Sequence, residues 1–229
     1  MLKKTKTIQT GFTLTEITVG LFIGAIILAS TLYVFSSLSR SGSQSLSRSR
    51  LNQDLSALIN VISDDVRRAG YWNWTPELSI PLKNNPFVQQ KWDIEINRYD
   101  ANETHSSCIT FSYDLDGDSL PGEKRMEQFG YRLRNKTIEM RTGGSSFNCQ
   151  SGNWQRITQT GMEINELSFL LNSYRINTSK SDPETPCQAN DLCVLRRSLH
   201  ISIIANNSGQ QKNILKLNNL IQIKNDKIF

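Results

Sequence analysis

FTLTEITVGLFIGAIILASTLYVF, residues 12–35, is the stretch of the chain that decides its fold. Of these 24 residues, 16 are apolar, two are glycine, five are serine or threonine, and only Glu16 is charged. At about 1.5 Å of rise per residue, a helix of this length spans roughly 36 Å, enough to cross the hydrocarbon core of a bilayer. We therefore expect a transmembrane helix. A carboxylate near its start is costly unless it is neutralised or paired, so Glu16 needs a partner.

The eleven residues before this stretch are basic, with Lys3, Lys4 and Lys6, and lack an apolar core of their own. An ordinary secretory signal is cleaved after its apolar region. Here the processing point that the sequence indicates, Gly11–Phe12, precedes that region, so cleavage would leave the whole apolar segment on the mature chain. A positive leader holds its end of the chain in the cytoplasm. We therefore expect a single pass of the inner membrane, with the C-terminal part in the periplasm.

The hexapeptide GFTLTE at residues 11–16, after a basic leader and before an apolar helix, closely resembles the type IV prepilin cleavage motif. The resemblance implies a membrane aspartyl prepilin peptidase that cuts after Gly11 and methylates the new amine of Phe12. It also implies that Glu16 sets axial register in a filament by pairing with such an amine, its own or a neighbour's. A plain signal-anchor with an accidental glutamate is the alternative.

The next segment, residues 36–70, changes character halfway. Residues 36–50 hold eight serines and Gly42, so either a flexible linker or a polar, locally loosened helix fits them. Apolar residues then recur every three or four positions and predict an amphipathic periplasmic helix that stops at Gly70: Leu51, Leu55, Leu58, Ile62, Val66 and Ala69. We expect this stripe to pack against the sheet of the head. A partner coiled coil is the alternative.

The segment DVRRAGYW, residues 65–72, resembles the end of the N-terminal helix in PilW-type minor pilins. This resemblance implies a subunit of a type IV pilus that primes polymerisation with other minor pilins and the major pilin and remains near the tip, supporting twitching motility and adhesion. It also implies that the subunit helps to display a PilY-family adhesin. A minor pseudopilin of a type II secretion system would share the N-terminal features and is the alternative. A membrane-anchored binding protein is a more distant one.

Residues 71–229 predict a β-rich head. Prolines at positions 76, 81 and 86 indicate loops over residues 78–102. Alternation of period two then predicts consecutive strands, with Asn135 and Lys136 as a hairpin turn. Strands without intervening helices favour an antiparallel sheet. The fold class that follows is α+β and pilin-like: a leader (1–11), a transmembrane or filament-core helix (12–35), a periplasmic helix (36–70) and a head (71–229).

Four cysteines all lie in the head, where an even number in an exported domain favours two disulfides: Cys108, Cys149, Cys187 and Cys193. Three pairings are open. The short spacing between Cys187 and Cys193 favours a local bridge, which leaves Cys108 with Cys149. A zinc site is the rival, but neither a CxxC spacing nor a nearby histidine supports it.

Three carboxylates at alternating positions suit calcium: Asp114, Asp116 and Asp118. The twelfth position, where an EF-hand requires glutamate, is Arg125; Glu123 could substitute for it. An ion-free Asp/Gly turn between two strands is the alternative, which the sequence favours.

No other pattern indicates catalysis or a cofactor. His105 and His200 join no constellation, and no HExxH, glycine-rich phosphate loop or GxSxG is present. Three of the charges behind the net +5 lie in the leader, and no basic run interleaves with aromatics, so we expect no direct nucleic-acid binding. We therefore expect a subunit that acts by assembly and not an enzyme.

Overall fold

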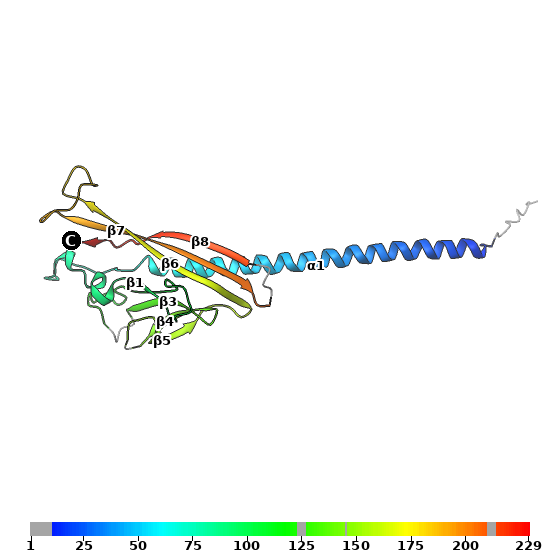
Figure 1. Cartoon of the computed structure of the whole chain (residues 1–229), viewed down its shortest axis with the longest axis horizontal. Coiled ribbons are helices and arrows are strands. Elements are labelled where there is room, and N and C mark those ends of the chain that lie inside the picture. Colours follow the sequence, from blue (N-terminus) through cyan, green and yellow to red (C-terminus); the bar gives the residue numbers. More distant parts are fainter. Residues whose placement is uncertain (1–10, 123–126, 145, 210–213) are drawn as a thin grey trace, which may run out of the picture. The chain divides into compact units, whose positions relative to one another are not determined.

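The computed structural model describes residues 11–122, 127–144, 146–209 and 214–229. It forms two compact units, Met1–Arg48 and Ser49–Phe229, and one helix, α1 (Leu14–Val66), belongs to both. Figure 1 shows α1 as an uninterrupted helix. Residues 36–50 are therefore helical, which excludes the flexible linker. Solvent-exposed serine costs a helix only a few tenths of a kcal/mol per residue, and no proline interrupts the segment.

In the first unit, α1 carries its apolar side chains on every side, and none of them is buried. Leu14, Phe22 and Leu32, for example, are each about two thirds exposed or more, at 82%, 69% and 67%. A helix that is apolar all round is stable only inside an apolar environment. This half of α1 therefore requires a bilayer or neighbouring subunits around it.

In the second unit, the predicted stripe from Leu51 to Ala69 is buried. The α-helix ends at Val66, four residues before the expected stop, because the amides of Arg68 and Ala69 bond to carbonyls three residues back and tighten the last turn. Gly70 then turns the chain with a φ of +73° and donates its N–H to the Ser112 carbonyl at 2.8 Å. A side chain there would also collide with Val88.

Residues 78–102, expected to be loop, also contain short regular elements. Three are single 3₁₀ turns, and the fourth is a short strand. Their bounds are η1 (Leu82–Asn84), η2 (Pro86–Val88), η3 (Gln90–Trp92) and β1 (Glu95–Asn97). Proline spacing does not reveal the strand, because its three residues are held by pairing with a distant partner.

The first sheet is antiparallel in the order β1-β2-β3-β4-β5. Asn135 and Lys136 form the predicted hairpin turn, both with positive φ, as a tight two-residue turn requires. From this turn, β3 pairs with β4 over four residue pairs. The first joins Arg134 to Thr137 and the last joins Tyr131 to Met140. The remaining strands are β2 (Cys108–Ser112), β3 (Gln128–Arg134), β4 (Thr137–Gly143) and β5 (Asn153–Arg156).

A second sheet follows, where the sequence predicted a single one. It has the order β6-β7-β8, with β9 pairing to one end of β7. The two sheets are not continuous, although Ile164 and Phe169 of β6 donate to carbonyls of Lys136 and Ser106 beside the first sheet. Strand periodicity says which residues face inward but not which strands pair. The bounds are β6 (Met162–Asn177), β7 (Cys193–Asn207), β8 (Ile214–Gln222) and β9 (Lys227–Ile228).

One hydrophobic core joins the end of α1 to both sheets. The helix stripe meets inward side chains of the first sheet, such as Phe111 and Ile138, and of the second, such as Phe169 and Ile201, all at most 1% exposed. Figure 1 shows the cyan end of α1 among these strands. The fold is α+β, with a long N-terminal helix packed on antiparallel β-sheets, which confirms the predicted fold class.

Replacing a residue of the stripe tests this core. Ile62 is fully buried among both sheets, so Ile62→Ala should lower the free energy of unfolding of the head by about 2–5 kcal/mol. Val61→Ala, one residue away and 53% exposed, is the matched control and should cost less than about 1 kcal/mol. Urea denaturation followed by tryptophan fluorescence measures both. Equal losses for the two variants would contradict this packing.

Candidate functional site

Glu16 lies in the first turn of α1, within a reciprocal capping box formed with Thr13. The Thr13 backbone N–H and hydroxyl each donate to the Glu16 carboxylate at 2.9 Å, and the Glu16 N–H reaches the Thr13 hydroxyl at 3.3 Å. This arrangement satisfies amides at the helix start and places a negative charge at the positive end of the helix dipole. No cation among the described residues pairs with Glu16. Its charge therefore still requires a partner from outside this helix.

Gly11 and Phe12 lie before α1, separated from it by Thr13, and are exposed, Phe12 by 83%. The peptide bond between them is the predicted processing point. Residues 1–10 of the leader lie outside the described residues.

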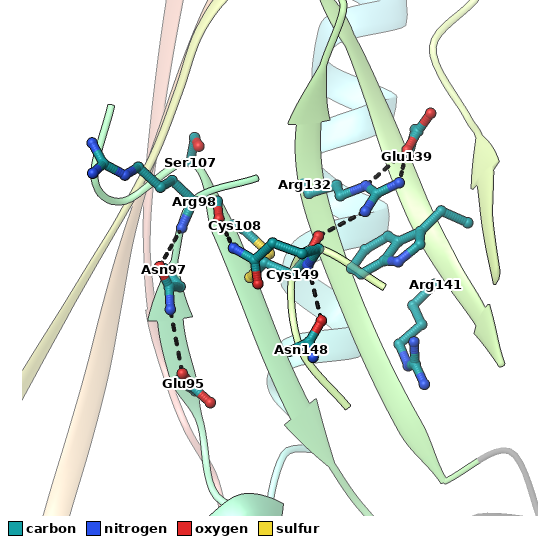
Figure 2. The surroundings of a disulfide bond; sticks show 12 residues. Glu95, Asn97, Arg98, Ser107, Cys108, Arg132, Glu139, Arg141, Asn148 and Cys149 are labelled. Atoms are coloured by element: carbon teal, nitrogen blue, oxygen red, sulfur yellow. Dashed lines mark hydrogen bonds and ion pairs between the residues drawn. A yellow bond between two sulfur atoms is a disulfide. The ribbon is translucent and has the colours of Figure 1, made fainter. Parts of the chain in front are cut away.

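Two disulfides form, and their pairing is the one that the spacing favours. Cys108 in β2 joins Cys149 in the loop after β4, and Cys187 joins Cys193 at the start of β7. No cysteine is free. Figure 2 shows that the first bridge fastens the loop holding Asn148 and Cys149 over β2 and β3.

The fastened loop supplies carbonyls to two buried arginines, which the sequence analysis did not single out. Arg132, 3% exposed, donates to the Cys149 carbonyl at 2.6 Å and pairs with Glu139 at 2.8 Å (Figure 2). Arg141, equally buried, donates to the Gly144 carbonyl and to Gln128 Oε1, at 3.0 and 2.9 Å. It has no carboxylate partner among the described residues. Burial, with Arg132 adding to it, lowers the pKa of Arg141.

The acidic loop brings together four carboxylates rather than three. The oxygens of Asp114, Asp116, Asp118 and Glu127 lie within 4.8 Å of one another. Glu127, which the sequence analysis missed, is fully buried and comes thirteen positions after Asp114, outside any standard loop spacing. Burial, first, and then the carboxylates of Asp116 and Asp114 raise its pKa, against hydrogen bonds from Gly122 and Leu115.

The same loop is also a well-formed turn. The Asp114 carboxylate accepts backbone N–H groups from Asn73, Gly117 and Ser119 at 3.1, 2.7 and 3.1 Å. These bonds alone explain why an aspartate is buried there, as the turn interpretation expects. Arg125, at the twelfth position of the predicted calcium loop, and Glu123, the substitute ligand, lie outside the described residues.

A second polar cluster lies where α1 meets the first sheet. Asp65 accepts the hydroxyls of Tyr113 and Tyr131 at 3.0 and 2.9 Å and pairs with Arg68 at 2.9 Å. Burial, and then the negative charge of Asp65, raise the pKa of both phenols far above the ordinary value. The cluster fixes the rotation of the helix against the sheet.

The histidines are not brought to any site. His105 is exposed in a loop near Arg98, and His200 lies on β7 between Leu170 and Leu220 of the flanking strands. Among the tryptophans, Trp72 is buried and its indole donates to the Ser119 carbonyl, whereas Trp154 lies against Arg132. Trp72 and Trp154 are therefore occupied in packing and in contact with arginine.

The architecture defines the class of protein. A helix long and apolar enough to cross a membrane, whose second half packs against antiparallel sheets, is the arrangement of pilin-like subunits. The family model described as prepilin peptidase-dependent protein B matches residues 44–223. The chain belongs to this family, and is a pilin-like structural component of a pilus or pseudopilus. The match begins after the motif at residues 11–16. No curated protein and no solved structure matches the chain.

Alkaline titration tests the Asp65 cluster. The raised pKa of Tyr113 and Tyr131 means that the folded chain favours the protonated phenols, so their contribution to stability is complete below the unfolded pKa of about 10 and is lost as the pH rises beyond it. Phenolate absorbance should show Tyr113 and Tyr131 still protonated in the native chain at a pH at which both ionise in urea.

Asp65→Asn is the matched variant for this titration. It removes the negative charge while leaving the phenols buried, so both late ionisations should move to lower pH without reaching the ordinary value. Ionisation of Tyr113 and Tyr131 at the same pH in the native wild-type chain as in urea would contradict the cluster.

Proposed function

We propose that this chain is a PilW-type minor pilin of a type IV pilus, which joins other minor pilins in priming pilus polymerisation and stays near the tip. In this proposal the chain is cleaved after Gly11, the amine of Phe12 is methylated, and partners include the major pilin and a PilY-family adhesin. The chain acts by assembly alone. Its route is through the inner membrane, with the head in the periplasm, and then into the pilus.

The proposal rests on the exposure of apolar side chains along the first half of α1. Its apolar side chains are exposed in the isolated chain, so a bilayer must surround them first and neighbouring helices afterwards. Glu16 is capped by Thr13 but has no cation among the described residues. The amine of a neighbouring subunit would supply that cation, and pairing would fix the axial position of one helix against the next.

The segment DVRRAGYW favours a pilus over the pseudopilus of a type II secretion system. In the structure it forms the end of α1 and the Gly70 turn, with Asp65 bonded to Tyr113 and Tyr131. This segment therefore fixes how the head joins its helix. A minor pseudopilin is the alternative function, and a membrane-anchored binding protein is the more distant one.

Deletion and complementation test the function. A clean deletion should abolish surface pili and leave the secretome unchanged, and the wild-type gene should restore pili. Normal pili with a defective secretome would establish the pseudopilin instead, and no change in either would favour the binding protein. The mass of the N-terminal peptide in the complemented strain reports cleavage after Gly11 and methylation of Phe12.

Glu16 variants in the same strain separate charge from helix capping. Glu16→Gln keeps an acceptor for the Thr13 amide but removes the charge, whereas Glu16→Ala removes both. Both should insert in the membrane and fail to enter pili. Thr31→Ala, which removes a hydroxyl bonded only to the preceding turn, is the matched control and should assemble normally. Normal incorporation of Glu16→Gln would contradict the ion pair.

Calcium is the ligand that we propose for the acidic loop, with the ion-free turn as the alternative. Oxygens on opposite sides of a bound calcium lie up to about 5 Å apart, and the four carboxylates fall within 4.8 Å of one another. Asp116 and Asp118 would bring the more accessible oxygens, and Asp114 and Glu127 the buried ones. The convergence of Glu127 favours the ion, because a turn alone does not require a fourth carboxylate.

Thermal unfolding distinguishes ion from turn. At saturating calcium the melting temperature of the purified chain should rise by roughly 5 °C or more, and magnesium at equal ionic strength should have a much smaller effect. Glu127→Gln should abolish the calcium effect, whereas Asp100→Asn, in a different loop, should leave it intact. A melting temperature unaffected by calcium would favour the ion-free turn.

A further inference from the structure

A cavity opens beside α1 where β3 and β4 stop pairing after Tyr131 and Met140. Its volume is about 580 Å³, which lies within the usual range of ligand pockets, about 300–1,000 Å³. Apolar side chains from four parts of the head contribute to its lining: Val61 of α1, Leu115 of the acidic loop, Phe129 of β3 and Met140 of β4. Val61 and Leu115 are more than half exposed, at 53% and 52%, so apolar surface continues onto the rim.

Within the part of the chain that the structure describes, the charged groups of the cavity are paired, with one exception. Asp65 is bound by two phenols and by Arg68, and Asp64 pairs with its own neighbour Arg67 at 3.1 Å. Arg141 also lines the cavity but has no carboxylate partner among the described residues. A buried guanidinium without a counter-charge is costly. Among the described residues, Arg141 is therefore the charged group of the cavity that has no ion-pair partner.

Two hydrogen-bond donors in the same place are also unused. Arg141 Nε and Gln128 Nε2 are buried and have no hydrogen-bond partner among the described residues, although the two residues are joined to each other through Nη2 and Oε1 at 2.9 Å. Gly152 permits this placement of Arg141, because a Cβ there would lie 1.9 Å from its Nη1. By contrast, Arg132 on the adjacent strand is neutralised by Glu139 (Figure 2).

We propose that this cavity receives a peptide segment of a neighbouring subunit, in which an acidic side chain is flanked by an apolar one. The carboxylate would lie against Arg141 and Gln128, and the apolar side chain would lie among Val61, Phe129 and Met140. This inference rests on the proposed function in one respect, since an assembled pilin-like subunit has neighbours that can supply the segment. The chemistry of the cavity does not depend on it.

Charge complementarity selects this occupant. A purely apolar segment would bury Arg141 further without neutralising it, and a basic one would add a second positive charge. A carboxylate is the acceptor that suits these donors, because it offers two oxygens with about four lone-pair sites. Charge-assisted hydrogen bonds of this kind are about twice as strong as neutral ones.

A small carboxylate tests the site in the purified full-length chain. The probe is 3-phenylpropionate, compared with 3-phenylpropionamide, which has the same shape and no charge. The carboxylate should bind about tenfold more tightly than the amide. Competition by raised chloride should weaken only the carboxylate. Equal binding of the two probes, or no binding of either, would overturn the proposal without bearing on the deletion phenotype.

Gln128→Glu supplies the missing carboxylate from within the chain. Its side chain already contacts Arg141, so the variant should melt at a higher temperature than wild type and lose the preference for the carboxylate probe. Gln155→Glu, on exposed β5, is the matched control and should keep that preference. Retention of the preference by Gln128→Glu would overturn the site. If this variant does not fold, the comparison of the two probes on the wild-type chain still decides.

Photo-crosslinking identifies the source of the carboxylate in cells. A benzophenone amino acid at Leu115, on the rim, should crosslink to a subunit peptide with Asp or Glu next to an apolar residue, and Gln128→Glu should remove that crosslink. The same group at Leu170, 58% exposed on β6 and outside the cavity, is the control. Crosslinks to lipid, or none above those at the Leu170 position, would overturn the proposed occupant.

Discussion

The buried stripe on the second half of α1 is the surface on which both sheets depend. Neither sheet could bury its own apolar face in water alone, and Leu55, Ile62 and Val66, all fully buried, lie in the core that they share with inward side chains of both. Asp65 lies between positions of this stripe and is bound by hydroxyls from β3 and from the segment after β2. Apolar burial thus holds the helix to the sheets, while the polar cluster fixes its rotation about its own axis.

The first half of the same helix differs, because the head does not bury its apolar side chains. Its apolar residues surround the helix instead of forming a stripe, so no single surface of its own head could cover them. Under the proposed function, such a helix exchanges one apolar environment for another as the chain moves from membrane to assembly. Glu16 is the exception to this apolar surface. Capping by Thr13 satisfies its hydrogen bonds but not its charge, and the proposed function assigns that charge to pairing between subunits.

The head shows how buried polar groups distinguish structural from recognition roles. Arg132 forms an ion pair with Glu139, donates to a loop carbonyl and lies over two aromatic rings. Its charge is therefore neutralised within the chain. Arg141 has carbonyls and an amide but no counter-charge among the described residues, and it lies at a cavity. The disulfide Cys108–Cys149 fastens the loop that serves Arg132 directly. The bridge therefore maintains the setting in which one arginine is neutralised and the other is left for a partner.

Much of this protein follows from local periodicity. The spacing of apolar residues in 12–35 and 51–69 determined a helix with two different environments, and alternation of period two determined strands around Phe111, Tyr131, Phe169 and Ile201. Short spacing also favoured the Cys187–Cys193 bridge. These features could be predicted because each depends on residues close together in the sequence. The helical state of residues 36–50 was left open, since serine disfavours a helix only weakly and the intact segments on either side decide the outcome.

Tertiary structure alone decided what distant residues form together. Two sheets arise instead of one, since pairing partners depend on packing around α1 and not on the alternation within a strand. Glu127 joins Asp114, and Asp65 joins Tyr113 and Tyr131, across separations of 13, 48 and 66 residues that no motif spacing encodes. The lack of a carboxylate partner for Arg141 among the described residues likewise follows only from its neighbours in the folded chain. The sequence specifies which side of its helix or strand each residue lies on, because that depends on local periodicity. Only folding determines which distant residues it contacts.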